Sequence, residues 1–191
     1  MPGATWAWRC PETSPDGSRN WYRMLGTEND RRRTSFSNCS SDGNTLQRGA
    51  VEMATGSVYS LPVTINYEDT DAAGVVYYAN YLAYMERARN ACLRAAGLPL
   101  TVVRDEHNAV FVVTEVRLRY RKPAMLDDVI SVTLEVDELR GASVTFIHHV
   151  LRGEELLVDG QIRLGILSGD TCVPCRIPDV VRQVLDRHRI Q

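Results

Sequence analysis

The chain contains no apolar run of the length that crosses a membrane, and its first thirty residues contain no short apolar stretch. A membrane-spanning helix needs roughly 18 or more apolar residues, and a secretory signal peptide needs an apolar segment close to the N-terminus. The five cysteines are odd in number and scattered, which disfavours the disulfide framework of a secreted domain. These absences predict a cytoplasmic protein with reduced thiols.

An excess of charge of one sign is absent as well, because the formal net charge is only −2 over 191 residues. A chain so close to neutral gives no reason to expect nucleic-acid binding, and any anionic ligand must be held by local basic groups. Cys172 and Cys175 have no further zinc ligands nearby, and the adjacent His148 and His149 point to opposite faces of a strand. No Gly-x-Ser-x-Gly segment occurs either. We therefore expect no metal site and no cofactor.

The chain divides into two unequal parts. Residues 1–56 are rich in Ser, Asn, Gly, Asp and Arg, and no period of 2 or 3.6 is sustained there. We expect a low-complexity, disordered N-terminal extension, or a stretch that precedes a physiological start at Met53. Residues 57–191 show strong hydrophobic patterning and are predicted to form one folded domain.

Two hydrophobic periods alternate along the second part. A period of two predicts strands at Leu61 to Tyr67 and at residues 110–122, 129–137, 142–151 and 156–167. Spacings of three and four predict a helix of about four turns from Tyr81 to Ala95, ended by Gly97 and Pro99, and a short helix over residues 179–188. This order favours an α+β domain with a helix on one face of an antiparallel sheet. The open edges of a single sheet favour at least a homodimer.

An acidic segment stands between the first strand and the long helix. Glu68, Asp69 and Asp71 lie within four residues, followed by Gly74 and by Tyr78 close to the helix start. Acidic side chains in front of a helix can simply cap its N–H groups and favour the positive end of its dipole. A structural role is therefore the first interpretation of each of them.

The whole segment, however, resembles a known family. Tyr67-Glu-Asp-Thr-Asp71, Gly74-Val-Val-Tyr-Tyr78, Asn80-Tyr81 and Glu86-Arg-Ala-Arg89 resemble the 4-hydroxybenzoyl-CoA thioesterase-like branch of the hot-dog superfamily. The nearest resemblance is to the acyl-CoA thioesterase subfamily linked in bacteria to the Tol-Pal system, and it covers about Leu61 to Leu167. It implies a hot-dog fold, in which a five-stranded sheet wraps around the long helix, and a homodimer or homotetramer that hydrolyses acyl-CoA.

The resemblance also implies roles for individual residues. It makes Asp71 the catalytic carboxylate, acting as a nucleophile or as a general base on water, and gives the backbone N–H of Tyr78 to the carbonyl oxygen. A histidine often stands at the position of Tyr78 in this family. Gly74 lets the backbone bend closely around the substrate. Glu86 is a secondary candidate, which can instead pair with Arg89 or Asn90 on the helix surface.

Coenzyme A carries several phosphates, and Arg119, Arg121 and Lys122 form the densest basic cluster of the second part. They are candidate CoA contacts, although a solvent-facing strand carries such charges as well. Two other functions stay open. One is a non-catalytic module that binds acyl-CoA or acyl carrier protein. The other is a hot-dog hydratase or dehydratase, which needs a histidine for proton transfer, and no histidine lies near Asp71 in the sequence.

Overall fold

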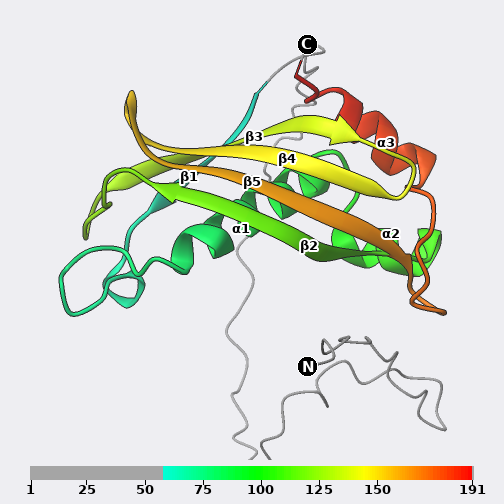
Figure 1. Cartoon of the computed structure of the whole chain (residues 1–191), viewed down its shortest axis with the longest axis horizontal. Coiled ribbons are helices and arrows are strands. Elements are labelled where there is room, and N and C mark those ends of the chain that lie inside the picture. The colour runs from blue at the N-terminus through cyan, green and yellow to red at the C-terminus, as the bar shows by residue number, and fades with distance from the viewer. Residues whose placement is uncertain (1–57, 191) are drawn as a thin grey trace, which may run out of the picture. The chain divides into compact units, whose positions relative to one another are not determined.

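The computed structural model describes residues 58–190, so the predicted N-terminal extension lies outside the described residues. Nine elements follow one another along this part of the chain (Figure 1). They are β1 (Tyr59–Thr64), the 3-10 helix η2 (Tyr67–Asp69), α1 (Asn80–Ala95), α2 (Leu100–His107), β2 (Ala109–Tyr120), β3 (Val129–Leu139), β4 (Ser143–Arg152), β5 (Glu155–Ser168) and α3 (Asp179–Asp186). None of the helices in this range is long and apolar enough to cross a membrane.

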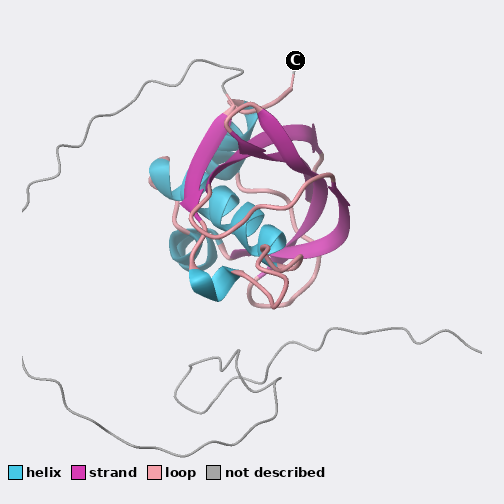
Figure 2. Cartoon of the chain, turned by 90° about the vertical axis from the view of Figure 1, so that its left-hand side faces the viewer, coloured by secondary structure: helices cyan, strands magenta, loops and turns pink. Residues whose placement is uncertain are grey.

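The five strands form one antiparallel sheet in the order β1-β3-β4-β5-β2. Seen end-on, the sheet curves around α1 instead of lying flat on it (Figure 2). Register shifts interrupt β2 after Val113, β3 after Val136 and β4 after Val150, and such bulges increase the local bend of a strand. The predicted α+β fold, a hot-dog arrangement of a five-stranded sheet around a long helix, is confirmed.

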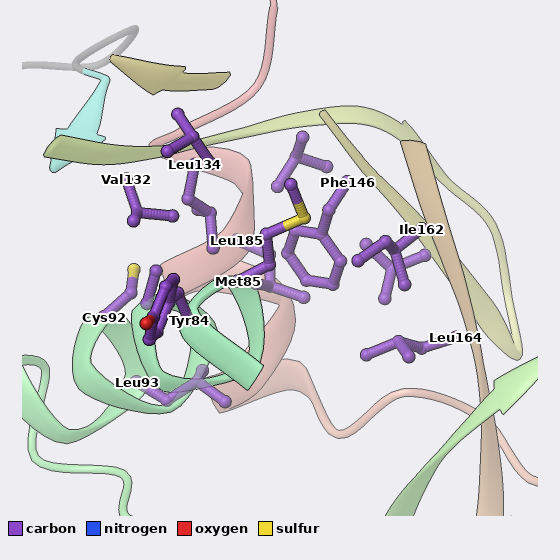
Figure 3. Packing of buried hydrophobic residues seen from close by; sticks show 14 of the residues in the cluster. Tyr84, Met85, Cys92, Leu93, Val132, Leu134, Phe146, Ile162, Leu164 and Leu185 are labelled. Carbon is purple, nitrogen blue, oxygen red and sulfur yellow. The ribbon is translucent and has the colours of Figure 1, made fainter. Parts of the chain in front are cut away.

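The core lies between α1 and the concave face of the sheet. Tyr84, Met85 and Cys92 of α1 are at most 3 % exposed, as their helical spacing predicts. They meet side chains of β3, β4, β5 and α3 (Figure 3). Gly160 of β5 permits this close packing, because a Cβ there would lie 2.7 Å from Leu118 Cδ2 and 2.9 Å from Met85 Cε. The absence of a side chain at this position lets the helix and the sheet approach each other.

Two short elements differ from the sequence prediction. The first strand ends at Thr64, and Tyr67, expected to continue its alternation, lies in η2 with 83 % of its surface exposed. Helix α2 was not predicted at all. Pro99 was interpreted only as a stop after the long helix, but it also occupies the N-cap position of α2. A proline can serve at both places, since its fixed φ suits the start of a helix and it cannot continue the preceding one.

The outer half of β2 also differs from the prediction of one buried face. Val116 and Tyr120 are 39 % and 47 % exposed, although the alternation of the strand predicts that both face a core. The physical reason is position, because β2 is an edge strand and pairs only with β5. Val180 of α3 is likewise 39 % exposed, whereas the neighbouring Val181 is buried.

Candidate active site

The loop between β1 and α1 is held together by Asp69, which is only 8 % exposed. Its carboxylate Oδ2 accepts a hydrogen bond of 2.8 Å from Asn66 N. Its main-chain oxygen accepts bonds of 2.9 Å from Tyr77 N and from Asn80 Nδ2. Of the three acidic residues in this segment, Asp69 therefore has a structural role, as the first interpretation expected.

Asp71 begins a tight turn that ends at Gly74. Asp71 O accepts a hydrogen bond of 2.9 Å from Gly74 N, and Asp71 N donates one of 2.9 Å to Val75 O. The carboxylate Oδ1 accepts a bond of 2.8 Å from Ala73 N, and Gly74 has a φ of +74°, which glycine adopts without strain. Asp71 is exposed, and within residues 58–190 no hydrogen-bond donor reaches its Oδ2. One carboxylate oxygen is thus fixed by the turn, and the other is available to a ligand.

The peptide between Tyr77 and Tyr78 stands directly in front of α1. Its carbonyl, Tyr77 O, accepts a hydrogen bond of 2.9 Å from Asn80 N in the first turn of the helix. In a trans peptide the N–H points opposite to the C=O, so Tyr78 N–H points away from the helix. No acceptor for this N–H is found among the described residues. A free donor therefore stands at the positive end of the α1 dipole.

Aromatic residues surround this amide. The rings of Tyr77 and Tyr78 lie 4.6 Å apart, and Tyr120 Oη donates a hydrogen bond of 3.0 Å to Tyr78 O. The Tyr78 hydroxyl and, to a lesser degree, the Asp71 carboxylate raise the pKa of Tyr77 above its usual value. The Asp71 carboxylate is thus within electrostatic range of Tyr77. Sequence reasoning did not identify Tyr120, which comes from β2.

A cleft of about 290 Å³ opens beside Tyr78. Tyr81 and Tyr120 form part of its wall, and Arg121 and Lys122 contribute the basic groups. The residues that line it are Val76, Tyr78, Tyr81, Tyr120, Arg121, Lys122 and Pro123. The structure therefore brings two of the three predicted basic residues next to the Tyr78 position.

The basic residues nevertheless have acidic neighbours. Arg121 Nε lies 2.6 Å from Asp159 Oδ2, and Lys122 forms an ion pair with Glu155. Arg119 is separated from this cleft. Arg119 pairs with Asp159 of β5 across the sheet. Gly160 and Ile162 face the core, and neighbouring residues of a strand point to opposite faces, so Asp159 and Arg119 lie on the outer face.

Glu86 and Arg89 occupy different environments on α1. Glu86 is exposed and, within residues 58–190, forms no ion pair with Arg89. Arg89 is only 6 % exposed, and its Nη1 lies 3.2 Å from Nε2 of the fully buried His148. The pairing of Glu86 with Arg89, one alternative left open by the sequence, is therefore not formed. His148 is a hydrogen-bonded core histidine, as its place on the apolar face of its strand indicated.

The arrangement can serve a polar reaction at a carbonyl group. A carboxylate with one unoccupied oxygen and a free N–H at a helix N-terminus can supply a base or nucleophile and an oxyanion donor. Within the described range, no group of three or more His, Cys, Asp or Glu residues is placed to hold a metal ion.

Comparisons with known proteins point to one family. A model described as the thioesterase-like superfamily matches residues 65–185. The acyl-CoA thioesterase YbgC of Haemophilus influenzae is 35 % identical over 124 residues, which cover 65 % of this chain and 91 % of the relative. The acyl-CoA thioester hydrolase YbgC of Escherichia coli O6:H1 is 38 % identical over 103 residues, covering 54 % and 76 %. Among solved structures, a probable thioesterase from Bartonella henselae has a TM-score of 0.61 at 28 % identity and covers 64 % of this chain and 100 % of its own.

Proposed function

Since this chain belongs to the thioesterase-like superfamily and is a thioester hydrolase, we propose that it cleaves acyl-CoA to free CoA and a carboxylic acid at Asp71 and Tyr78. The observation that carries the proposal is the Tyr78 N–H, which has no acceptor within residues 58–190 although it stands at the start of a helix. A donor held in this way binds the oxygen of a thioester carbonyl more strongly as negative charge develops on it. The nearby Asp71 carboxylate supplies the second requirement of the reaction.

Asp71 can act in either of two ways. Its free oxygen Oδ2 attacks the carbonyl carbon, the C–S bond breaks, and water then hydrolyses the resulting mixed anhydride. Alternatively Asp71 removes a proton from a water molecule that attacks the same carbon. In both cases CoA leaves as a thiolate, because a thiol with a pKa of about 8.5 needs no strong general acid. A single carboxylate therefore suffices, which is consistent with the absence of histidine from the turn at residues 71–74.

We propose Arg121 and Lys122 as contacts for CoA phosphates, since both line the cleft beside Tyr78. Their present ion pairs are exposed, and exposed pairs contribute little to stability, so a phosphate can replace Asp159 or Glu155 at low cost. Arg119 faces the outer side of the sheet and is the weaker candidate. Gly74 acts indirectly, by shaping the turn that presents Asp71.

The free edge of β2 favours a homodimer. The exposed Val113, Val116 and Tyr120 lie on this strand, and unpaired edge strands readily pair with another copy. Tyr120 also holds Tyr78 O, so a partner bound along β2 lies next to the proposed site. The second acyl donor to test is an acyl carrier protein, which presents the same thioester on a protein surface.

The experiment is thiol release from short aliphatic, long aliphatic and aromatic acyl-CoAs by wild type, Asp71→Asn and Asp71→Ala. Asparagine keeps a side-chain oxygen that accepts the hydrogen bond of Ala73 N, so the turn stays intact while the charge is lost. We expect both variants to lose more than about 100-fold in kcat/KM, a loss typical of removing a catalytic base. Glu68→Gln, in the same loop and exposed, is the control and keeps its activity.

Other outcomes identify the alternatives. Full activity of Asp71→Asn together with loss in Asp71→Ala assigns Asp71 to the turn only, and the catalytic proposal is then wrong. Wild-type protein that binds acyl-CoA without releasing thiol is a binding module. Addition of water to an enoyl-CoA, followed by absorbance, identifies a hydratase.

A further inference from the structure

Arg89 is a buried cation that the proposed reaction does not use. It lies in the third turn of α1, is 6 % exposed, and its guanidinium carbon is 5.9 Å from the centre of the Phe146 ring. A guanidinium carries five N–H groups, and within residues 58–190 its one hydrogen bond joins Nη1 to His148 Nε2. Charged side chains are rarely buried so completely without an acid beside them.

The histidine gives Arg89 no counter-charge. His148 Nδ1 lies 2.8 Å from Thr133 O, a carbonyl that can only accept, so the proton is on Nδ1 and the bare Nε2 accepts from Arg89. Burial and, secondly, the charge of Arg89 lower the pKa of His148 to about 3, so the ring is neutral at physiological pH. The pair therefore carries one net positive charge in the core.

The unused nitrogens of Arg89 border a cleft. Among the described residues, only Tyr84 Oη is a side-chain nitrogen or oxygen that solvent does not reach and that has no hydrogen-bond partner. The guanidinium nitrogens of Arg89 that form no hydrogen bond do not belong to this class, so they remain accessible to solvent. Arg89 lines a cleft of about 120 Å³ together with Leu93, Phe146 and Leu164. Leu93 comes from α1, Phe146 from β4 and Leu164 from β5, and all three side chains point into the same interior (Figure 3).

Most of the cleft lining is apolar, and a few polar residues complete it. Phe111 and Val113 of β2 and Leu164 of β5 form apolar surface, and Glu86 and Asn90 are the other polar residues of the lining. Burial lowers the pKa of Arg89, and the charge of Glu86 raises it only in part. Glu86 is exposed, so water screens much of its charge, and it compensates the buried cation only partly. The cleft thus combines a hydrocarbon-binding wall with a cation whose hydrogen-bonding capacity is mostly unused.

We propose that this cleft receives the far end of the acyl group, and that Arg89 selects acyl groups that end in a carboxylate. A carboxylate neutralises a guanidinium and accepts two parallel hydrogen bonds from it, while the methylene chain packs on the apolar wall. The proposal rests on the proposed acyl-CoA hydrolysis and adds a substrate class to it. Arg89 is in this account a specificity residue, because it contacts the substrate away from the reacting carbon.

The positions along α1 agree with this assignment. From Asn80, the first residue of α1, to Arg89 the helix rises about 14 Å at 1.5 Å per residue, and Tyr78, the proposed donor to the thioester oxygen, lies two residues before Asn80. Arginine side chains in helices lean towards the N-terminus, which shortens that separation. A medium-length dicarboxylic acyl chain can therefore reach from one group towards the other.

The test compares kcat/KM for adipyl-CoA with hexanoyl-CoA, and for suberyl-CoA with octanoyl-CoA, using the full chain. We expect wild type to prefer the carboxylate-ended member of each pair. Arg89→Met, which keeps the length of the side chain without its charge, reduces that preference about 10- to 100-fold, the worth of a charge-assisted hydrogen bond. Arg89→Lys keeps part of it. Arg94→Met, exposed on the same helix, leaves the preference unchanged.

Two results overturn the proposal. One is a wild-type enzyme that prefers hexanoyl-CoA and octanoyl-CoA, a result that does not depend on whether Arg89→Met folds. The other is a folded Arg89→Met with an unchanged ratio. If wild type releases no thiol from any acyl-CoA, acyl-CoA hydrolysis itself has failed, and calorimetric binding of hexanoate against the neutral hexanamide then decides. Hexanoate binding that Arg89→Met abolishes supports the cleft assignment, whereas equal binding of hexanoate and hexanamide, or no binding of either, contradicts it.

Discussion

His148 makes the stability of the fold depend on pH in a predictable direction. Burial, assisted by Arg89, lowers the pKa of this ring to about 3, whereas in the unfolded chain it titrates near its ordinary value of about 6.5. Between these two values the unfolded chain binds a proton that the folded protein does not bind. The free energy of unfolding therefore rises with pH across this window. The contribution is complete above about pH 6.5 and is lost progressively as the pH falls towards 3.

The magnitude follows from the size of the window. One pH unit inside it corresponds to about 1.4 kcal/mol for one proton, so acidification from pH 7.5 to pH 5.0 costs about 2 kcal/mol through His148 alone. His148 is 0 % exposed, so solvent does not screen this effect. We expect His148→Gln, which cannot take up the proton, to lose about 2 kcal/mol less than wild type over the same interval.

The measurement is urea unfolding at pH 7.5 and at pH 5.0 for wild type, His148→Gln and His149→Gln. His149 is the matched control, because it is the adjacent residue of β4 and is half-exposed on the other face of the sheet. We expect His149→Gln to retain the wild-type difference between the two pH values. An unchanged difference in His148→Gln refutes the reasoning, since it means that His148 takes up its proton equally in the folded and unfolded chains.

The remaining predictions concern packing, assembly and the Tyr78 peptide. Gly160→Ala costs about 1–3 kcal/mol in urea unfolding, because its Cβ overlaps Leu118 and Met85, and an unchanged stability means that these side chains yield freely. Val116→Lys on the β2 edge converts a dimer into monomers in sedimentation, whereas Val180→Lys, equally exposed on α3, does not; a dimer that survives contradicts pairing through β2. Tyr120→Phe removes the hydrogen bond to Tyr78 O and lowers kcat/KM by about 2- to 12-fold, which corresponds to the free energy of one hydrogen bond. The control Tyr67→Phe leaves kcat/KM unchanged, and equal activity of both variants shows that the bond to Tyr78 O is not needed.

The sequence predicted the elements that have one buried face. The alternation at Ile130, Val132 and Leu134 marks β3, and the spacing of Tyr81, Met85 and Ala88 marks α1, because burial repeats with the period of each element. The turn at residues 71–74 and the 3-10 helix η2 could not be predicted in this way. They are held mainly by main-chain hydrogen bonds, which impose no hydrophobic period.

The candidate site was predictable only in part. The resemblance drew attention to Asp71 and Tyr78, and local spacing then placed both beside the start of α1. Contacts from distant parts of the chain were missed. Tyr120 reaches Tyr78 O from 42 residues away, and Arg89 turns inwards to His148, 59 residues away, although its helix position alone is compatible with a surface residue. Such contacts depend on how β2 and β4 pair in the sheet, which sequence periodicity does not determine.

The free donor in front of α1 belongs to the main chain, and this determines which changes evolution can make at position 78. Any residue except proline keeps the N–H, and the bond from Asn80 N to Tyr77 O fixes its direction whatever side chain follows. A tyrosine at this position therefore presents the same donor as a histidine would. The side chain at this position is then free to diverge, while the proposed oxyanion donor is kept.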